Sequence, residues 1–181
     1  MSAPTREQPA EQPPDPSLPL VERPSTRLLI LDETGSILLF RASTPAGMWL
    51  WFPPGGGVEA GETHEEAGAR ELWEETGQRL PLGPHVWTRD VIVPWEIDGR
   101  PARVRGVERY HLIWTARFEP EPQFMDATEG YMRDEGWFRW WSVEEIVAHT
   151  GYETFVPRDL GTLLPPILKG EAPSEPLEVG L

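Results

Sequence analysis

The sequence predicts one α/β domain, because short apolar runs typical of strands lie on both sides of one well-marked helix. The chain has 181 residues, which is enough for one ordinary domain with a sizeable core and short for two. Hydrophobic residues make up 39% and charged residues 25%, as is usual in globular proteins. A second domain is therefore not expected.

Several classes of protein are excluded by composition. Cysteine is absent, which excludes disulfides, thiolate metal sites and a cysteine nucleophile. No apolar run approaches the roughly 20 residues that cross a bilayer, and the N-terminus lacks the apolar stretch of a signal peptide, so we expect a cytoplasmic protein with no membrane partner. The net charge of −14 argues against polymeric nucleic acid as a partner, although a bound divalent cation still permits a small phosphorylated substrate.

The two ends of the chain are predicted to lie outside the domain. Residues 1–24 are rich in proline and poor in apolar residues, which is typical of a disordered or polyproline-like arm. The domain is expected over residues 25–169, followed by a flexible tail over 170–181.

The first half of the domain contains a hairpin, a glycine-rich break and a helix. The apolar runs 28–31 and 37–40, separated by polar residues and a glycine, predict two antiparallel strands. An aromatic run follows at 49–52 and ends at Pro53-Pro54-Gly55-Gly56-Gly57, a tight backbone passage. Thr63 and Glu66 have the spacing of a capping box and Gly77 is suited to end a helix, so a helix is predicted from about Thr63 to Thr76.

The second half continues the sheet and adds two short helices. Asp98-Gly99 is a strong hairpin signal between two apolar runs, and Ser142 is placed to cap a helix. The elements expected here are strands at 91–93, 104–107, 110–116 and 137–141, a helix through His149, and a last helix over 160–168 interrupted by Pro165-Pro166.

Three glutamates on the predicted helix carry the clearest chemical signal. Glu71, Glu74 and Glu75 stand at positions i, i+3 and i+4, which share one face of a helix. Like charges there destabilise one another by a few tenths of a kcal/mol per pair, roughly, and more when partly buried, unless a cation lies among them. Hard oxygen ligands without cysteine indicate Mg²⁺, with Mn²⁺ as its substitute.

The residues before this face suit the same purpose. Glycines 55 to 57 let the backbone pass close to a ligand or another segment, and Glu62 precedes the first helical turn, where an anion complements the helix dipole. Arg70 is interpreted as a strut that holds the glycine-rich loop or a neighbouring glutamate.

The segment 56–78 resembles the Nudix box, whose pattern is G-x5-E-x7-R-E-U-x-E-E-x-G-U with U a bulky apolar residue. Chance agreement at this composition has a likelihood on the order of 10⁻⁵. Only the last position departs, because Gln78 stands where the pattern has an apolar residue. The matching residues are Gly56, Glu62, Arg70, Glu71, Leu72, Glu74, Glu75 and Gly77.

The resemblance implies a Nudix-type α/β/α sandwich around a mixed β-sheet and an enzyme that cleaves a diphosphate bond. The implied substrate is a nucleoside diphosphate linked to another moiety, such as a nucleoside triphosphate, ADP-ribose or a dinucleotide. It further implies that Glu71, Glu74 and Glu75 bind the metal and that one of them activates the attacking water, while the choice of base stays open. Arg70 joins them as a catalytic residue, and Arg41, Gly56 and Gly57 are the residues expected to bind the substrate.

Other side chains are weaker candidates. Family members often add a carboxylate from positions such as Glu108, Glu129, Asp134 or Glu135, each of which is more often merely solvated. Trp49, Trp51, Trp95 or Trp137 could stack on a nucleobase, although core packing is the commoner role. Trp73 lies nearly opposite the glutamates and is interpreted as a packing residue or a contact in a homodimer.

Two other functions compete with hydrolysis. A nucleotide-sensing or regulatory module on a Nudix scaffold usually loses box glutamates, whereas this chain retains all of them. The second is an isomerase of isoprenoid diphosphates on this scaffold. In its usual form such an enzyme needs a reactive cysteine, and this chain has none.

Overall fold

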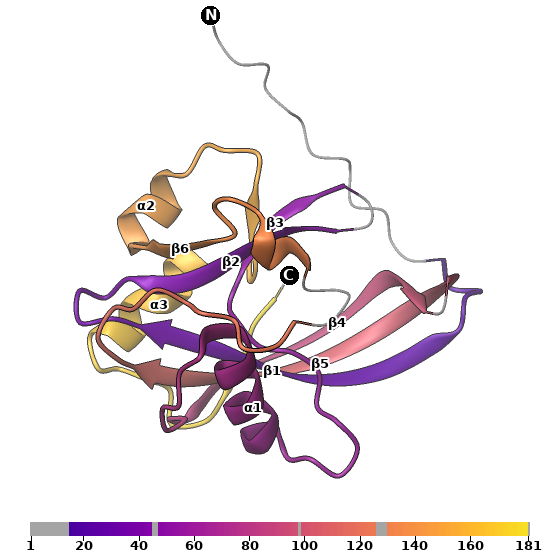
Figure 1. Cartoon of the computed structure of the whole chain (residues 1–181), viewed down its shortest axis with the longest axis horizontal. Helices are drawn as coiled ribbons and strands as arrows, with labels where there is room; N and C mark the ends of the chain where they lie inside the picture. Colours follow the sequence, from indigo (N-terminus) through magenta and orange to yellow (C-terminus); the bar gives the residue numbers. More distant parts are fainter. Residues whose placement is uncertain (1–14, 45–46, 98, 126–129, 181) are drawn as a thin grey trace, which may run out of the picture.

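The computed structural model describes residues 15–44, 47–97, 99–125 and 130–180 (Figure 1). A mixed sheet of eight strands forms the centre of this part, in the order β7-β3-β2-β1-β5-β4-β8, with β6 paired to β2. The strands are β1 (Leu20–Leu31), β2 (Ile37–Ser43), β3 (Trp49–Phe52), β4 (His85–Ile97), β5 (Arg100–Trp114), β6 (Phe138–Trp141), β7 (Thr154–Phe155) and β8 (Leu177–Glu178). The helices are α1 (His64–Thr76), α2 (Val143–Ala148) and α3 (Leu160–Leu168), with a 3-10 turn, η1, at Gly130–Arg133.

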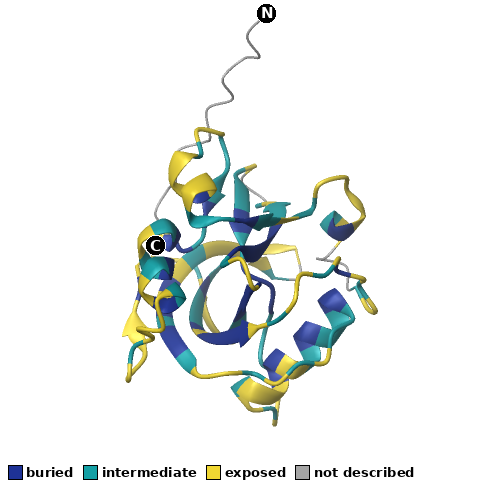
Figure 2. Ribbon diagram, turned by 90° about the vertical axis from the view of Figure 1, so that its left-hand side faces the viewer, coloured by how far each residue is buried: buried dark blue, intermediate teal, exposed yellow. Residues whose placement is uncertain are grey.

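Helices cover both faces of the sheet. Successive residues of a strand point to opposite sides, so each apolar strand contributes buried side chains to both faces. Leu28 and Ile30 of β1 pack with Leu72 of α1 on one face. Leu29 and Leu31 lie on the other face, where the same cluster includes residues of α2 and α3. The predicted α/β/α sandwich around a mixed sheet is therefore confirmed, and Figure 2 shows that the strands curl around the buried centre.

Two predicted hairpins are present. β1 and β2 pair antiparallel with Leu31 opposite Ile37, and β4 and β5 pair antiparallel with Ile97 opposite Arg100. β5 unites two runs that the sequence separates at Glu108 and Arg109, because both of these charged residues lie within the ladder.

The N-terminal boundary of the ordered chain differs from the prediction. β1 begins at Leu20, and residues 20–24, assigned to the disordered arm, pair in parallel with residues 103–107 of β5. All five are exposed, so backbone hydrogen bonds rather than apolar burial hold this stretch, and composition does not reveal such bonds. Residues 1–14 of the expected arm lie outside the described residues.

The C-terminal end also differs. β8 pairs with Trp87 and Thr88 of β4, and Val179 is buried in the core, although the sequence places both in a flexible tail. The predicted interruption of the last helix is wrong, because α3 runs through Pro165 and Pro166. Proline's fixed φ is compatible with a helix, and the buried side chains of α3 offset the hydrogen bonds lost at its two prolines.

α1 is the longest helix in the described part of the chain, at 13 residues. No helix there has the length and apolar character that crossing a membrane requires.

Candidate active site

The ends of α1 form as the sequence predicts. Thr63 caps the helix: its side chain accepts a hydrogen bond from the Glu66 amide at 3.2 Å, and the Glu66 carboxylate accepts one from the Thr63 amide at 2.8 Å. At the other end Gly77 adopts φ 72°, a left-handed conformation that glycine tolerates best. Leu72 is fully buried against the sheet, which fixes the rotation of the helix and directs the glutamate face towards the glycine-rich loop.

The glutamates differ in their exposure. Glu71 and Glu75 are 5% and 2% exposed, whereas the Glu74 side chain keeps 22% of its surface in solvent. Glu75 accepts a hydrogen bond of 2.6 Å from the Gly55 amide. Two of the three expected metal ligands are thus nearly buried carboxylates at the edge of the loop.

Arg70 joins the helix to the loop. Its Nη1 donates to Glu71 at 2.7 Å and to Glu74 at 3.2 Å, and its Nη2 donates to the Gly57 carbonyl at 2.9 Å. Nε and Nη2 also form a two-point contact with Glu62, each bond being 2.9 Å. These are the contacts of a strut between the glycine-rich loop and the glutamates.

The ion pair between Arg70 and Glu62 favours the charged forms of both residues. The hydrogen bonds from Arg70 lower the pKa of Glu62 below its ordinary value, and those with Glu62 raise the pKa of Arg70. Glu62 and Arg70 therefore stay charged throughout the neutral pH range.

The glycine-rich loop lies close to the helix and to β1. The amides of Thr26 and Leu28 donate to the carbonyls of Gly56 and Pro54, both at 2.9 Å. A Cβ on Gly56 would lie only 2.4 Å from Oε1 of Glu71. The backbone at Gly56 thus lies directly against a box carboxylate, and a side chain there would displace that carboxylate.

The donor set of this site suits a hard divalent cation. Within the described residues, no three or more His, Asp or Glu side chains form a ready-made metal site, since Arg70 and the Gly55 amide hold carboxylate oxygens of the box. However, Glu62, Glu71 and Glu74 bring three negative charges to the single positive charge of Arg70, and all the donors are oxygens. The residues present fit Mg²⁺ or Mn²⁺ chemically.

Arg41 lies at a different place from the box residues. It pairs with Glu153 at 3.0 Å, donates to the Tyr152 hydroxyl at 2.6 Å and lies over the Trp49 ring at 4.2 Å. None of the contacts recorded for it in the described chain reaches a box glutamate. Its role in binding phosphate remains a prediction, and such a role requires it to share or exchange these partners.

The weaker candidates are placed as follows. Trp51 is buried in the core beside Trp141, and Trp137 packs against Phe40. Trp95 is 37% exposed on β4. Trp73 is half-buried beneath the guanidinium of Arg79 at 4.9 Å.

Among the candidate carboxylates outside the box, Asp134 and Glu135 are exposed, and Glu129 lies outside the described residues.

Glu108 is buried within a group of charged residues that the sequence did not bring together. It accepts hydrogen bonds from Arg27 at 3.3 Å, from Arg89 at 2.8 Å and from the Tyr110 hydroxyl at 2.7 Å. Burial raises the pKa of Glu108, but the two arginines outweigh burial and hold the pKa below its ordinary value. In the sequence, this buried charged group is indicated by charged residues that lie within otherwise apolar strands.

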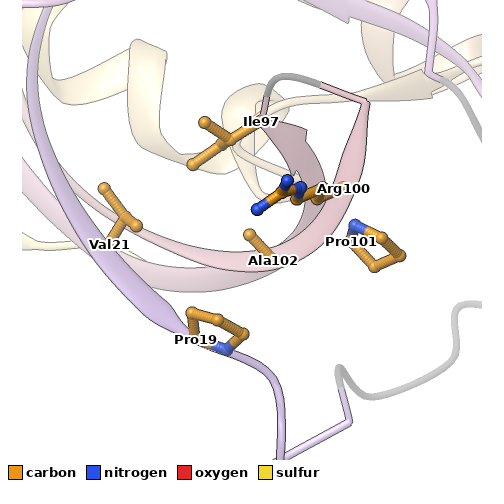
Figure 3. Close-up of a pocket in the computed structure, with 6 residues that line it drawn as sticks. All are labelled: Pro19, Val21, Ile97, Arg100, Pro101 and Ala102. Carbon is orange, nitrogen blue, oxygen red and sulfur yellow. The ribbon is translucent and has the colours of Figure 1, made fainter.

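The distal end of the β4–β5 hairpin has a surface hollow of about 410 Å³ (Figure 3). Apart from Arg100 its lining is apolar: Pro19, Val21, Ile97, Pro101 and Ala102. No residue of the box contributes to it, so we do not assign it to the candidate site.

Comparison with known proteins identifies the family. A sequence model described as NUDIX domain matches residues 21–159. The m7GpppN-mRNA hydrolase NUDT17 of Homo sapiens is 34% identical over 110 residues, which cover 54% of this chain and 32% of that protein. The RNA pyrophosphohydrolase of Caulobacter vibrioides is 31% identical over 127 residues, covering 68% of this chain and 73% of that protein.

A solved structure agrees with these sequence matches. The MutT protein from Methanosarcina mazei Go1 superposes with a TM-score of 0.52 at 25% identity, covering 86% of this chain and 99% of that one. The chain spans only 20% to 32% of the length of three vertebrate NUDT17 proteins. Because the family's sequence model nonetheless covers most of this chain, the protein belongs to the Nudix family.

Proposed function

We propose that this protein is a Mg²⁺-dependent hydrolase that cleaves the diphosphate bond of a nucleoside diphosphate linked to another moiety. The observation that carries the proposal is the grouping of Glu62, Glu71 and Glu74 around Arg70, with Glu75 bonded to the adjoining loop at Gly55. Relatives named as an RNA pyrophosphohydrolase and an mRNA hydrolase support the same class of reaction.

The proposed metal ligands are Glu71, Glu74 and Glu75. A bound Mg²⁺ would lower the pKa of a water molecule and neutralise charge on the phosphoryl oxygens. Arg70 orients Glu71 and Glu74 through its hydrogen bonds, and Glu62 holds Arg70 at two points. Gly56 and Gly57 are proposed to bind the substrate through their backbone beside Glu71, and one of the three glutamates accepts the proton of the attacking water.

The substrate is proposed only as a class: a nucleoside triphosphate, an ADP-ribose type compound or a dinucleotide. Two relatives carry RNA in their names, whereas the net charge of −14 disfavours long contacts with a polyanion. We therefore propose that the recognised part of the substrate is a single nucleotide or the terminal nucleotide of a chain. We also propose that the protein acts in the cytoplasm and that any oligomer is a homodimer.

A screen of nucleotide diphosphate compounds with Mg²⁺ or Mn²⁺ tests the proposal, with released phosphate measured after coupling to a phosphatase. Replacing Glu75→Gln preserves the acceptor for the Gly55 amide but removes the charge, so turnover should fall by about two decades or more. Glu65→Gln is the matched control, because Glu65 is an exposed glutamate in the first turn of the same helix. Full activity of Glu75→Gln excludes the proposal, and nucleotide binding without turnover in the unaltered protein favours the sensor.

A further inference from the structure

A continuous series of hydrogen bonds leads from the box into the sheet. The Gly55 amide donates to Oε2 of Glu75 at 2.6 Å, and the Gly55 carbonyl accepts from Nη1 of Arg27 at 2.8 Å. Nε of Arg27 in turn donates to Glu108 at 3.3 Å. One residue of the loop therefore connects a box carboxylate to a charged group on the central strands.

The amide and carbonyl of Gly55 form hydrogen bonds with side chains, whereas the carbonyls of its two neighbours form hydrogen bonds with backbone amides. The carbonyls of Pro54 and Gly56 accept from the amides of Leu28 and Thr26 on β1. Gly55 itself has φ 124°, and a Cβ there would lie 2.2 Å from the Thr26 carbonyl oxygen. Gly55 is therefore held by Glu75 at its amide and by Arg27 at its carbonyl, and its Cα joins the two peptides that carry these groups.

Arg27 is held firmly because its own carboxylate partner is held. Glu108 is 7% exposed and also accepts hydrogen bonds from Arg89 and Tyr110. Two arginines and one glutamate leave the group with a net charge of one positive unit, and Gly55 lies between this group and the negatively charged box. The charge of Arg27 therefore attracts the carboxylate of Glu75.

We propose that Arg27 is a positioning residue for Glu75, acting through the backbone of Gly55, and that Glu108 positions Arg27. The inference rests on the proposed function, since it gives Glu75 a place in the reaction. Without Arg27 the Gly55 carbonyl loses its donor, so the Gly55–Gly56 peptide can turn about the Gly55 Cα and shift the adjoining Pro54–Gly55 peptide, whose amide orients the Glu75 oxygen.

The first test is made without substrate. In the full-length protein the Gly55 amide proton should resonate downfield because of its short bond to a carboxylate, and Arg27→Met should move it upfield. Binding of Mn²⁺ alone, followed by electron paramagnetic resonance, should weaken roughly 10–100-fold in Arg27→Met, as is typical when a group that orients a metal ligand is removed. Glu108→Gln should change both readouts in the same direction by a smaller amount.

The second test is kinetic and uses the compound turned over fastest in the screen above. Arg27→Met should lower kcat roughly 10–100-fold with KM changed by less than about twofold, because the role proposed for Arg27 is to position Glu75 and not to bind the nucleotide. Arg27→Lys keeps a donor and a charge and should recover part of the loss. Arg105→Met is the matched control, because Arg105 lies on β5 and pairs with the exposed residues Glu22 and Asp90.

The outcomes separate this inference from the proposed function. An unchanged Gly55 resonance and unchanged Mn²⁺ affinity in Arg27→Met would overturn the positioning role, even if the variant is less stable. Absence of turnover in the unaltered protein counts against the proposed function, while the resonance and Mn²⁺ measurements still decide whether Arg27 positions Glu75.

Discussion

At the scale of single residues, Gly55 and Gly56 are adjacent but serve different needs. A Cβ on Gly55 would meet the backbone of β1 at 2.2 Å, whereas a Cβ on Gly56 would meet the Glu71 carboxylate at 2.4 Å. Backbone cannot yield without disturbing the strand, but the end of a glutamate side chain can move. Substitution of Gly56 should therefore affect mainly activity, whereas substitution of Gly55 should also affect stability.

Gly56→Ala should leave the fold largely intact and lower activity about tenfold or more, because Glu71 must turn away from Arg70. Gly55→Ala should lower activity as well, because the Gly55 amide orients Glu75, and it should also lower the free energy of unfolding by about 3 kcal/mol or more, since strained φ and a backbone clash act together. Chemical denaturation and turnover measured on both variants check this contrast.

Gly130→Ala serves as the control, because no heavy atom lies within 4 Å of its Cβ position. Wild-type activity in Gly56→Ala would show that the contact between this glycine and Glu71 has no functional weight.

At the scale of elements, α1 is defined by signals within its own sequence. The capping box, the left-handed glycine and one apolar residue facing the sheet all lie between residues 63 and 77. Such local agreement is what allows a helix to be predicted from sequence. The strands are different, because β1 and β5 pair in parallel although about 80 residues separate the partners in the register.

Thr63→Ala should destabilise the protein by about 1 kcal/mol, because it removes the side-chain acceptor of the capping box. For a chain of this size the midpoint of thermal unfolding should fall by about 2–4 °C. Turnover at saturating substrate should remain near that of the unaltered protein, since Glu62 and Arg70 keep their contacts.

Thr63→Ser retains the acceptor and should restore the midpoint, which provides the control for the loss of the methyl group. A Thr63→Ala variant with an unchanged melting midpoint would contradict the role of this cap.

At the scale of the whole molecule, the dominant property is the excess of acidic over basic residues. The net charge is −14, and the box concentrates carboxylates against one guanidinium. Like charges held together in a folded protein oppose folding, and a cation that binds the folded state reverses part of that cost. Stability should therefore report on the metal independently of catalysis.

Adding Mg²⁺ at about 100 times its dissociation constant should stabilise the folded protein by about 2.7 kcal/mol, measured as a rise in the melting midpoint. Glu75→Gln should show a much smaller rise, because a neutral side chain is a poor ligand for this ion. Sodium chloride at matched ionic strength controls for screening of the remaining charges. Equal responses of the two proteins would mean that Mg²⁺ acts elsewhere.

The sequence by itself determined α1, its caps and the glutamates on its face, because these depend on spacing along one helix. It also indicated the first hairpin and the strut role of Arg70, whose partners Glu71 and Glu74 lie within four residues of it.

Only the tertiary structure decided that β1 begins at Leu20, that Val179 joins the core, and that Arg27 meets both Gly55 and Glu108. These features join segments between 28 and 91 positions apart, as in Arg27 with Gly55 and Val179 with Thr88. Such contacts follow from how the strands are ordered and packed, and no periodicity within a single segment encodes that order.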